Sequence, residues 1–203
     1  MTFYSAGRNC LHHAILSTPR HPVNTPANRY HRLSISLHWL TLLLLIAVYA
    51  LIELRGIYPR GSEARELMKQ WHFMLGLLVF ALLLVRLPAR AILRAPPITP
   101  TPPAWQQWLA KAMHLALYAF LIGMPLLGWM VLSAEGKPIP FMGLSLPALI
   151  GPDDAQAERF EDIHTLLGTI GYWLIGLHAA AALYHHHVMR DDTLLRMTLR
   201  RRR

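Results

Sequence analysis

The stretch IHTLLGTIGYWLIGLHAAAALYHHH, residues 163–187, decides the fold of this chain. It contains no Asp, Glu, Lys or Arg, and about 20 apolar residues in a helix are enough to cross the core of a bilayer. Two histidines, His164 and His178, lie fourteen residues apart within it. At 100° per residue this spacing returns to within about 40° of the same helical face, after a rise of about 21 Å. The segment therefore predicts a transmembrane helix that carries two imidazoles on one face, at two depths.

Three further runs free of these charged residues predict three more spans, at residues 33–52, 70–85 and 112–134, with the fourth at 163–189. The composition agrees, since 54% of the residues are hydrophobic and only 15% are charged, against about 25% charged in soluble domains. We therefore predict an all-α, integral membrane four-helix bundle.

The segments between the spans differ in character. Residues 62–69 are predicted to lead into the second helix. Residues 95–103, APPITPTPP, predict an extended linker, because proline fixes φ and removes hydrogen-bond donors. Residues 136–154 predict a longer loop whose apolar part lies at the membrane interface. Residues 1–28 lack the apolar core of a signal peptide, so we interpret them as a disordered tail or as residues upstream of the true start. The transmembrane domain is then residues 29–203.

Lysine and arginine predict the orientation. With both termini and the proline-rich linker on one side, that side holds fourteen of the twenty basic residues and only two of the eleven acidic ones. Cytoplasmic loops of membrane proteins carry such an excess, so both termini are predicted to be cytoplasmic. The net charge of +9 then belongs to membrane-facing loops and not to a nucleic-acid-binding surface.

Each histidine of the fourth helix has a predicted partner at its own depth. The first helix runs outward with His38 near its cytoplasmic start, and the second runs back with His72 near the periplasmic surface. His72 is therefore level with His164, and His38 with His178. Two axial imidazoles complete the coordination of a haem iron and favour electron transfer, whereas zinc prefers a tetrahedral cluster at one depth. The pattern predicts two haem groups, each held by two histidines.

Covalent c-type haem is excluded, because the single cysteine, Cys10, is not part of a C-x-x-C-H motif. The haems are therefore predicted to be non-covalent b haems. Gly76 and Gly168 each follow a paired histidine by one helical turn, where a missing side chain would admit a macrocycle. Arg86, fourteen residues after His72, is placed at the inner level, where it can pair with a haem propionate or simply anchor the helix end. His114 is predicted to be a hydrogen-bonded packing residue, since both pairs are complete without it.

Four stretches carry a family resemblance: RLSISLHW (32–39), ELRGIYPR (53–60), IGYWLIGLHAAAALYHHH (170–187) and DDTLLRM (191–197). They resemble the bacterial cytochrome b561 family, and the likeness runs from about residue 30 to 197. The resemblance implies a multi-pass inner-membrane bundle with two b haems, whose ligands match His38, His72, His164 and His178. It further implies oxidation of superoxide at the periplasmic face, with transfer of the electrons to ubiquinone.

Under this expectation a cationic patch beside His72 would steer the superoxide anion toward the outer haem. Its members are Arg55, Arg60, Arg65 and Lys69. The same residues can also be an ordinary solvated loop, because the outer side as a whole carries six basic and nine acidic residues. His185, seven residues beyond His178, and Trp173 are candidate ubiquinone contacts, although either can be a packing or interface residue.

Two other functions stay open at the level of sequence. The chain can be a cytochrome b subunit that relays electrons between a peripheral dehydrogenase or hydrogenase and the quinone pool. It can also be a non-redox membrane protein whose histidines bind metal ions or protons, in which case the purified protein would be colourless.

Overall fold

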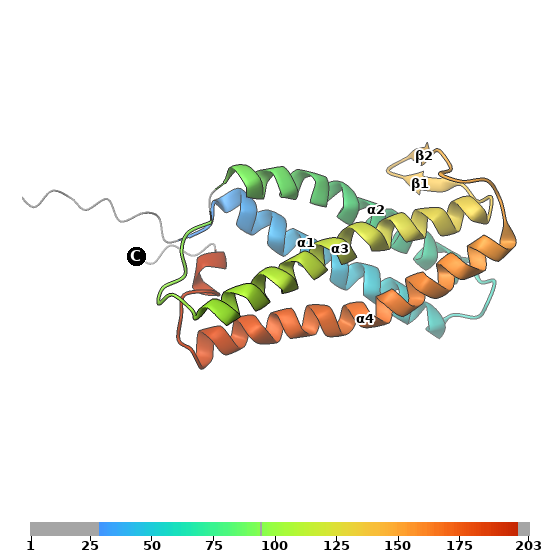
Figure 1. Ribbon diagram of the computed structural model, residues 1–203. Helices are drawn as coiled ribbons and strands as arrows, with labels where there is room; N and C mark the ends of the chain where they lie inside the picture. Colours follow the sequence, from blue (N-terminus) through green and yellow to red (C-terminus); the bar gives the residue numbers. More distant parts are fainter. Residues whose placement is uncertain (1–28, 94, 199–203) are drawn as a thin grey trace, which may run out of the picture.

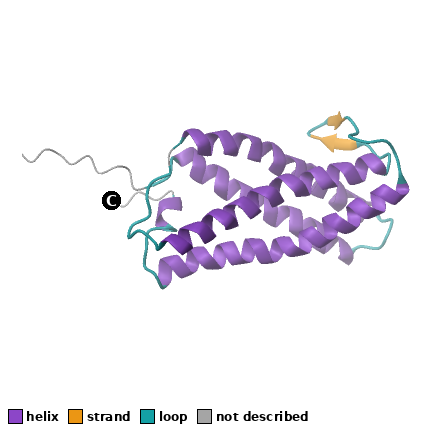
Figure 2. Ribbon diagram, in the orientation of Figure 1, coloured by secondary structure: helices purple, strands orange, loops and turns teal. Residues whose placement is uncertain are grey.

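The computed structural model describes residues 29–93 and 95–198, and it consists of four long helices lying side by side (Figures 1 and 2). These are α1 (Arg32–Leu54), α2 (Glu63–Ile92), α3 (Ala104–Ala134) and α4 (Asp154–His187). All four are long and apolar enough to cross a membrane. The predicted four-helix fold is confirmed, and only the last predicted span runs beyond its helix, by two residues. The prediction for residues 1–28 lies outside the described part of the chain.

Side-chain caps start α2 and α4 well before their uncharged runs. The Ser62 hydroxyl accepts a hydrogen bond from the backbone N–H of Arg65, so residues 63–69 are helical, as predicted. Asp153 accepts the N–H of Gln156 at 3.0 Å, and hydrogen bonds from Gln156 lower the pKa of this carboxyl. A carboxylate at a helix N-terminus is also favoured by the helix dipole. Helix α4 therefore begins at Asp154, and its first turns, which contain acidic residues, precede His164.

A β-hairpin occupies the α3–α4 connection, where sequence reasoning predicted only an interfacial loop. Strands β1 (Ile139–Phe141) and β2 (Leu144–Leu146) pair antiparallel, with Pro140 opposite Ser145. The two turn residues, Met142 and Gly143, both have positive φ, as a tight two-residue hairpin turn requires. Ile139 is buried against α2 and α3, which fixes the hairpin at one end of the bundle.

Helix contacts leave much apolar surface facing outward. Helix α1 packs mainly on α2, and α3 packs mainly on α4. The residues buried between the helices are few, and include Val79, Leu83 and Leu121. Leu115 and Trp173 are 71% and 79% exposed, which a lipid-facing surface explains.

Gly171 lies midway along α4 between His164 and His178, where two aromatic side chains cross the bundle. A Cβ atom at this position would collide with the Tyr49 hydroxyl and the Phe120 ring. The Tyr49 hydroxyl donates a hydrogen bond to the carbonyl of Gly168 at 2.8 Å. The absence of a side chain at Gly171 therefore lets α1 and α3 fill the middle of the bundle.

The end opposite the hairpin is closed by residues 190–197, which we call the C-terminal clasp. Trp39 donates its indole N–H to the Met197 carbonyl at 2.9 Å, and the N–H of Thr99 binds the Asp192 carboxylate at 3.0 Å. Arg196 is only 3% exposed, and its guanidinium donates to the Pro96 carbonyl. The clasp therefore joins the start of α1 to the proline-rich linker, which is non-helical as predicted.

Candidate functional site

Two histidine pairs lie at two levels of the bundle. His72 of α2 and His164 of α4 form the hairpin-side pair, with ring centres 6.2 Å apart and ring planes at 75°. His38 of α1 and His178 of α4 form the terminal-side pair, with ring centres 6.3 Å apart and ring planes at 72°. The structure thus brings together the two pairs that the predicted depths matched.

The two separations are those expected of imidazoles on opposite sides of one metal ion. Metal–imidazole bonds are about 2.0–2.1 Å long, and a ring nitrogen lies about 1.1 Å from the ring centre, so the two ring centres should be about 6.3 Å apart. This distance is also too long for a direct hydrogen bond between the rings. Each pair therefore fits one iron between its two side chains.

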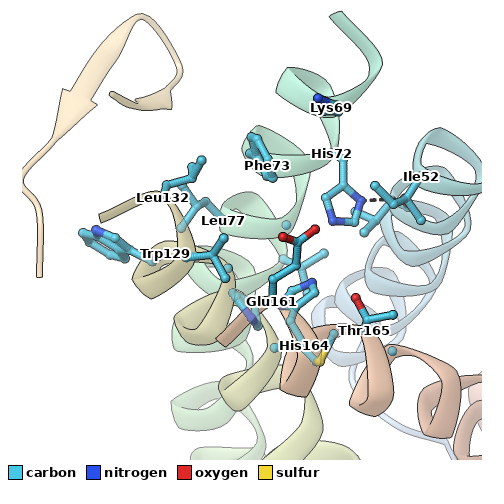
Figure 3. Close-up of a pocket in the computed structure, with 18 of the residues that line it drawn as sticks. Ile52, Lys69, His72, Phe73, Leu77, Trp129, Leu132, Glu161, His164 and Thr165 are labelled. Carbon is cyan, nitrogen blue, oxygen red and sulfur yellow. Dashed lines mark hydrogen bonds between the residues drawn. The ribbon is translucent and has the colours of Figure 1, made fainter. Parts of the chain in front are cut away.

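A cavity of about 630 Å³ surrounds the hairpin-side pair. This volume is within the range of about 300–1,000 Å³ that is typical of cofactor sites. Side chains of all four helices line the cavity, and Figure 3 shows His72 and His164 among them. Gly76 and Gly168 also line it, as does Gly128, where a Cβ would be only 3.4 Å from the His164 ring. The cavity therefore has both the size and the small side chains that a haem requires.

The orientation of His72 also fits ligation of iron. Its Nδ1 lies 2.9 Å from the Val48 carbonyl oxygen, which can only accept a hydrogen bond. Nδ1 therefore carries the proton, and Nε2 is left as the free ligand nitrogen. Such a hydrogen bond to the second ring nitrogen is typical of histidines that bind metals.

The terminal-side level contains two further groups. The Arg86 guanidinium lies 2.8 Å from His38 Nδ1, so Arg86 lies at the terminal-side level. His114 has its ring centre 5.6 Å from that of His178, and its Nδ1 donates to the Ala110 carbonyl at 2.7 Å. His114 is thus hydrogen-bonded, as predicted, but it is also a third imidazole beside the terminal-side pair.

The predicted cationic patch is divided in the structure. Arg55 and Lys69 line the hairpin-side cavity, but Lys69 is paired with Glu66 at 2.7 Å. Arg65 donates to the carbonyls of Arg55 and Tyr58, so it closes the α1–α2 turn. Arg60 is exposed in that turn and does not line the cavity.

Sequence reasoning missed several polar residues of the cavity. Glu161 lies one helical turn before His164, and Figure 3 shows its carboxylate pointing into the cavity. The Tyr172 hydroxyl donates to Glu53 at 2.7 Å, and both line the same cavity. The three-residue spacing of Glu161 and His164 was a signal for a shared helical face.

The two candidate quinone contacts lie in different surroundings. His185 Nδ1 is 2.6 Å from the Asp191 carboxylate, which is 5% exposed. Burial alone would raise the pKa of Asp191, but hydrogen bonds from His185 and Thr193 outweigh it and lower the pKa. Trp173 is highly exposed on the lipid-facing surface and does not line the hairpin-side cavity.

Comparison with known proteins matches nearly the whole described chain. The family model described as prokaryotic cytochrome b561 matches residues 29–199. The chain is 40% identical over 175 residues to cytochrome b561 homolog 1 of Escherichia coli (strain K12), which covers 86% of this chain and 99% of that protein. It is 37% identical over 174 residues to the probable superoxide oxidase CybB of Yersinia pestis, with 86% and 98% covered. It is 32% identical over 179 residues to cytochrome b561 homolog 2 of Escherichia coli (strain K12), with 86% and 93% covered.

Proposed function

Because this chain belongs to the prokaryotic cytochrome b561 family, as its sequence predicted, we propose that it is a di-haem superoxide:ubiquinone oxidoreductase. The family consists of b-type cytochromes, and the four spans agree with a place in the bacterial inner membrane. The observation that carries the proposal is the pair of nearly equal histidine separations, 6.2 and 6.3 Å, at two levels of one bundle. The similarity to a probable superoxide oxidase supports the choice of substrate.

In this proposal the four paired histidines hold two b haems. When bound, haem supplies one-electron exchange at an iron whose axial positions are both filled. The Val48 carbonyl fixes the ring of His72 and leaves Nε2 free for the iron. Ligation through Nε2 of His38 would place the proton on Nδ1, so the Arg86 guanidinium would turn from that nitrogen to a propionate.

We place the hairpin side in the periplasm and both termini in the cytoplasm, because of the basic excess on the terminal side. Superoxide would then meet the bundle at the hairpin-side cavity, where Arg55 is the lining cation that forms no ion pair among the described residues. Two superoxide anions give two oxygen molecules and two electrons. One ubiquinone takes up these two electrons and two protons to form ubiquinol.

Ubiquinone reduction needs a proton donor, and His185 is the candidate on the terminal side. Its Nδ1 lies 2.6 Å from the buried Asp191 carboxylate, which fixes the orientation of the ring. Lipid-facing Trp173 remains a second candidate contact for the quinone. In both cases the quinone would arrive laterally from the bilayer.

The test is a visible absorption trace of the detergent-purified holoprotein during enzymatic generation of superoxide. We expect prompt haem reduction that superoxide dismutase abolishes and that added ubiquinone reverses. If dithionite reduced the haem but superoxide did not, the proposed activity would be wrong. The relay subunit would then be the better interpretation, and a partner dehydrogenase or hydrogenase should be sought.

A further inference from the structure

The charged side chains around the hairpin-side pair leave a net negative charge. The cavity is lined by three basic and four acidic residues. Two of the basic residues are neutralised locally, because Lys69 pairs with Glu66 at 2.7 Å and Lys137 pairs with Glu135 at 3.0 Å. The charges that remain are Glu53, Arg55 and Glu161, with a sum of −1.

Glu161 is the unpaired carboxylate that faces the two imidazoles. Among the described residues it forms no hydrogen bond and no ion pair, whereas Glu53 accepts the Tyr172 hydroxyl at 2.7 Å. Its carboxylate points into the cavity that contains His72 and His164 (Figure 3). Glu161 is itself exposed at the rim of this cavity, so water screens part of its charge, but it lies within reach of both imidazoles and no cation neutralises it in the described part of the chain.

The terminal-side pair has the opposite charge beside it. The Arg86 guanidinium is 2.8 Å from His38 Nδ1 and pairs with no acidic side chain in the described part of the chain, and it would keep its charge at this level if it turned to a haem propionate. The described residues of the terminal side have the same sign overall, because they include seven basic and only two acidic side chains. The two levels therefore combine similar imidazole pairs with opposite local charge.

Local charge shifts the reduction potential of a metal centre. A negative charge stabilises the ferric form and lowers the potential, and a positive charge stabilises the ferrous form and raises it. We propose that Glu161 and Arg86 establish a potential step, in which the hairpin-side centre has the lower midpoint potential and the terminal-side centre the higher one. This rests on the proposed binding of one haem at each level, and it directs each electron from the hairpin side to the terminal side without moving a proton.

The test is a redox titration of the purified holoprotein, followed in the haem bands. The Glu161→Gln variant should raise the lower midpoint and leave the higher one in place. A tenfold fall in the equilibrium constant for electron transfer from the hairpin-side to the terminal-side centre corresponds to a narrowing of about 59 mV between the two midpoint potentials. Glu161→Lys should give a larger shift in the same direction. Glu158→Gln is the matched control, because Glu158 is exposed one turn earlier on α4 and does not line the cavity.

Arg86 gives the complementary variant. Arg86→Gln should lower the higher midpoint, and Arg86→Lys, which keeps the charge, should largely restore it. If Arg86→Gln loses haem, the midpoint potentials of the Glu161→Gln and Glu161→Lys variants test the inference without it. The inference is overturned if Glu161→Gln shifts no midpoint more than Glu158→Gln does, or if it moves the higher one. Because these midpoints are measured without superoxide, a failure of the proposed substrate would be seen separately.

Discussion

The two histidine levels have nearly the same ligand geometry in different surroundings. Their ring separations differ by 0.1 Å, from 6.2 to 6.3 Å. The hairpin-side pair lies in a cavity of about 630 Å³ that charged side chains line. The terminal-side pair lies beside Arg86 and a third imidazole, at the end of the bundle that the C-terminal clasp covers. Under the proposed function, the paired histidines would define the type of centre, and the neighbouring side chains would distinguish the electron-donor side from the acceptor side.

The largest expected effect separates His38 from His114 at the terminal-side level. His38→Ala should remove one of two haems per chain, since its ring is spaced from His178 as an axial ligand. His114→Ala should keep both haems, because His38 and His178 already supply two axial imidazoles, and the 5.6 Å between the ring centres of His114 and His178 is shorter than the separation expected across one iron. The measurement is the ratio of haem to protein after purification. Loss of one haem in His114→Ala, with both retained in His38→Ala, would reverse the assignment.

A second variant tests the layer between the two levels. Gly171→Ala places a Cβ against the Tyr49 hydroxyl and the Phe120 ring, so α4 must shift. Overpacking of this kind costs about 1–3 kcal/mol. The expected result is a lower midpoint temperature of thermal unfolding in detergent and slower electron transfer between the two histidine levels. Gly176→Ala is the control, because a Cβ there would have no atom of another described helix or loop within 4 Å, and equal stability of the two variants would contradict this packing.

A pH experiment tests whether the terminal-side level is closed by the clasp. The folded-state pKa of Asp191 is lowered, because hydrogen bonds from His185 and Thr193 outweigh the effect of burial. Its carboxylate therefore stabilises the clasp above an unfolded pKa of about 3.9, and this contribution is lost as the pH falls through the lower folded value. Hydrogen bonds to a charged group contribute about 1.5–3 kcal/mol.

The readout is hydrogen exchange of the amides of residues 190–197. Protection should be high near neutral pH and should fall below about pH 3.9. Asp191→Asn should lower the protection at neutral pH and remove most of this pH dependence, while Asp154→Asn, at the opposite end of the bundle, should change neither. Protection in Asp191→Asn equal to that of the wild type would show that the carboxylate does not hold the clasp.

The smallest expected effect concerns the cations of the hairpin side. Arg55→Glu should lower the rate of haem reduction by superoxide several-fold at low salt, and the difference should shrink as salt is added. Arg60→Glu should have less effect, because Arg60 does not line the cavity. Equal effects of the two variants would indicate long-range attraction by the whole loop.

Much of the fold could be predicted because helix periodicity and hydrophobicity are local properties. The uncharged runs gave four helices, and the fourteen-residue spacing of His164 and His178 gave two levels. The hairpin at Ile139 was missed, since three-residue strands that depend on packing against α2 carry little pattern of their own.

The side-chain environment of the site was harder to predict. Which cations remain unpaired depends on contacts between neighbours, such as Lys69 with Glu66. The link between His185 and Asp191 requires the chain to turn back after α4, which spacing alone does not reveal. Glu161 was the one omission with a clear sequence signal, at one turn from His164.

The most direct test of the central claim is the haem content of the purified wild-type chain, measured together with its visible spectrum. Two histidine pairs predict two b haems per chain, both low-spin because both axial positions are filled. One haem per chain, or a spectrum of iron with an open axial position, would contradict the assignment of one haem to each level.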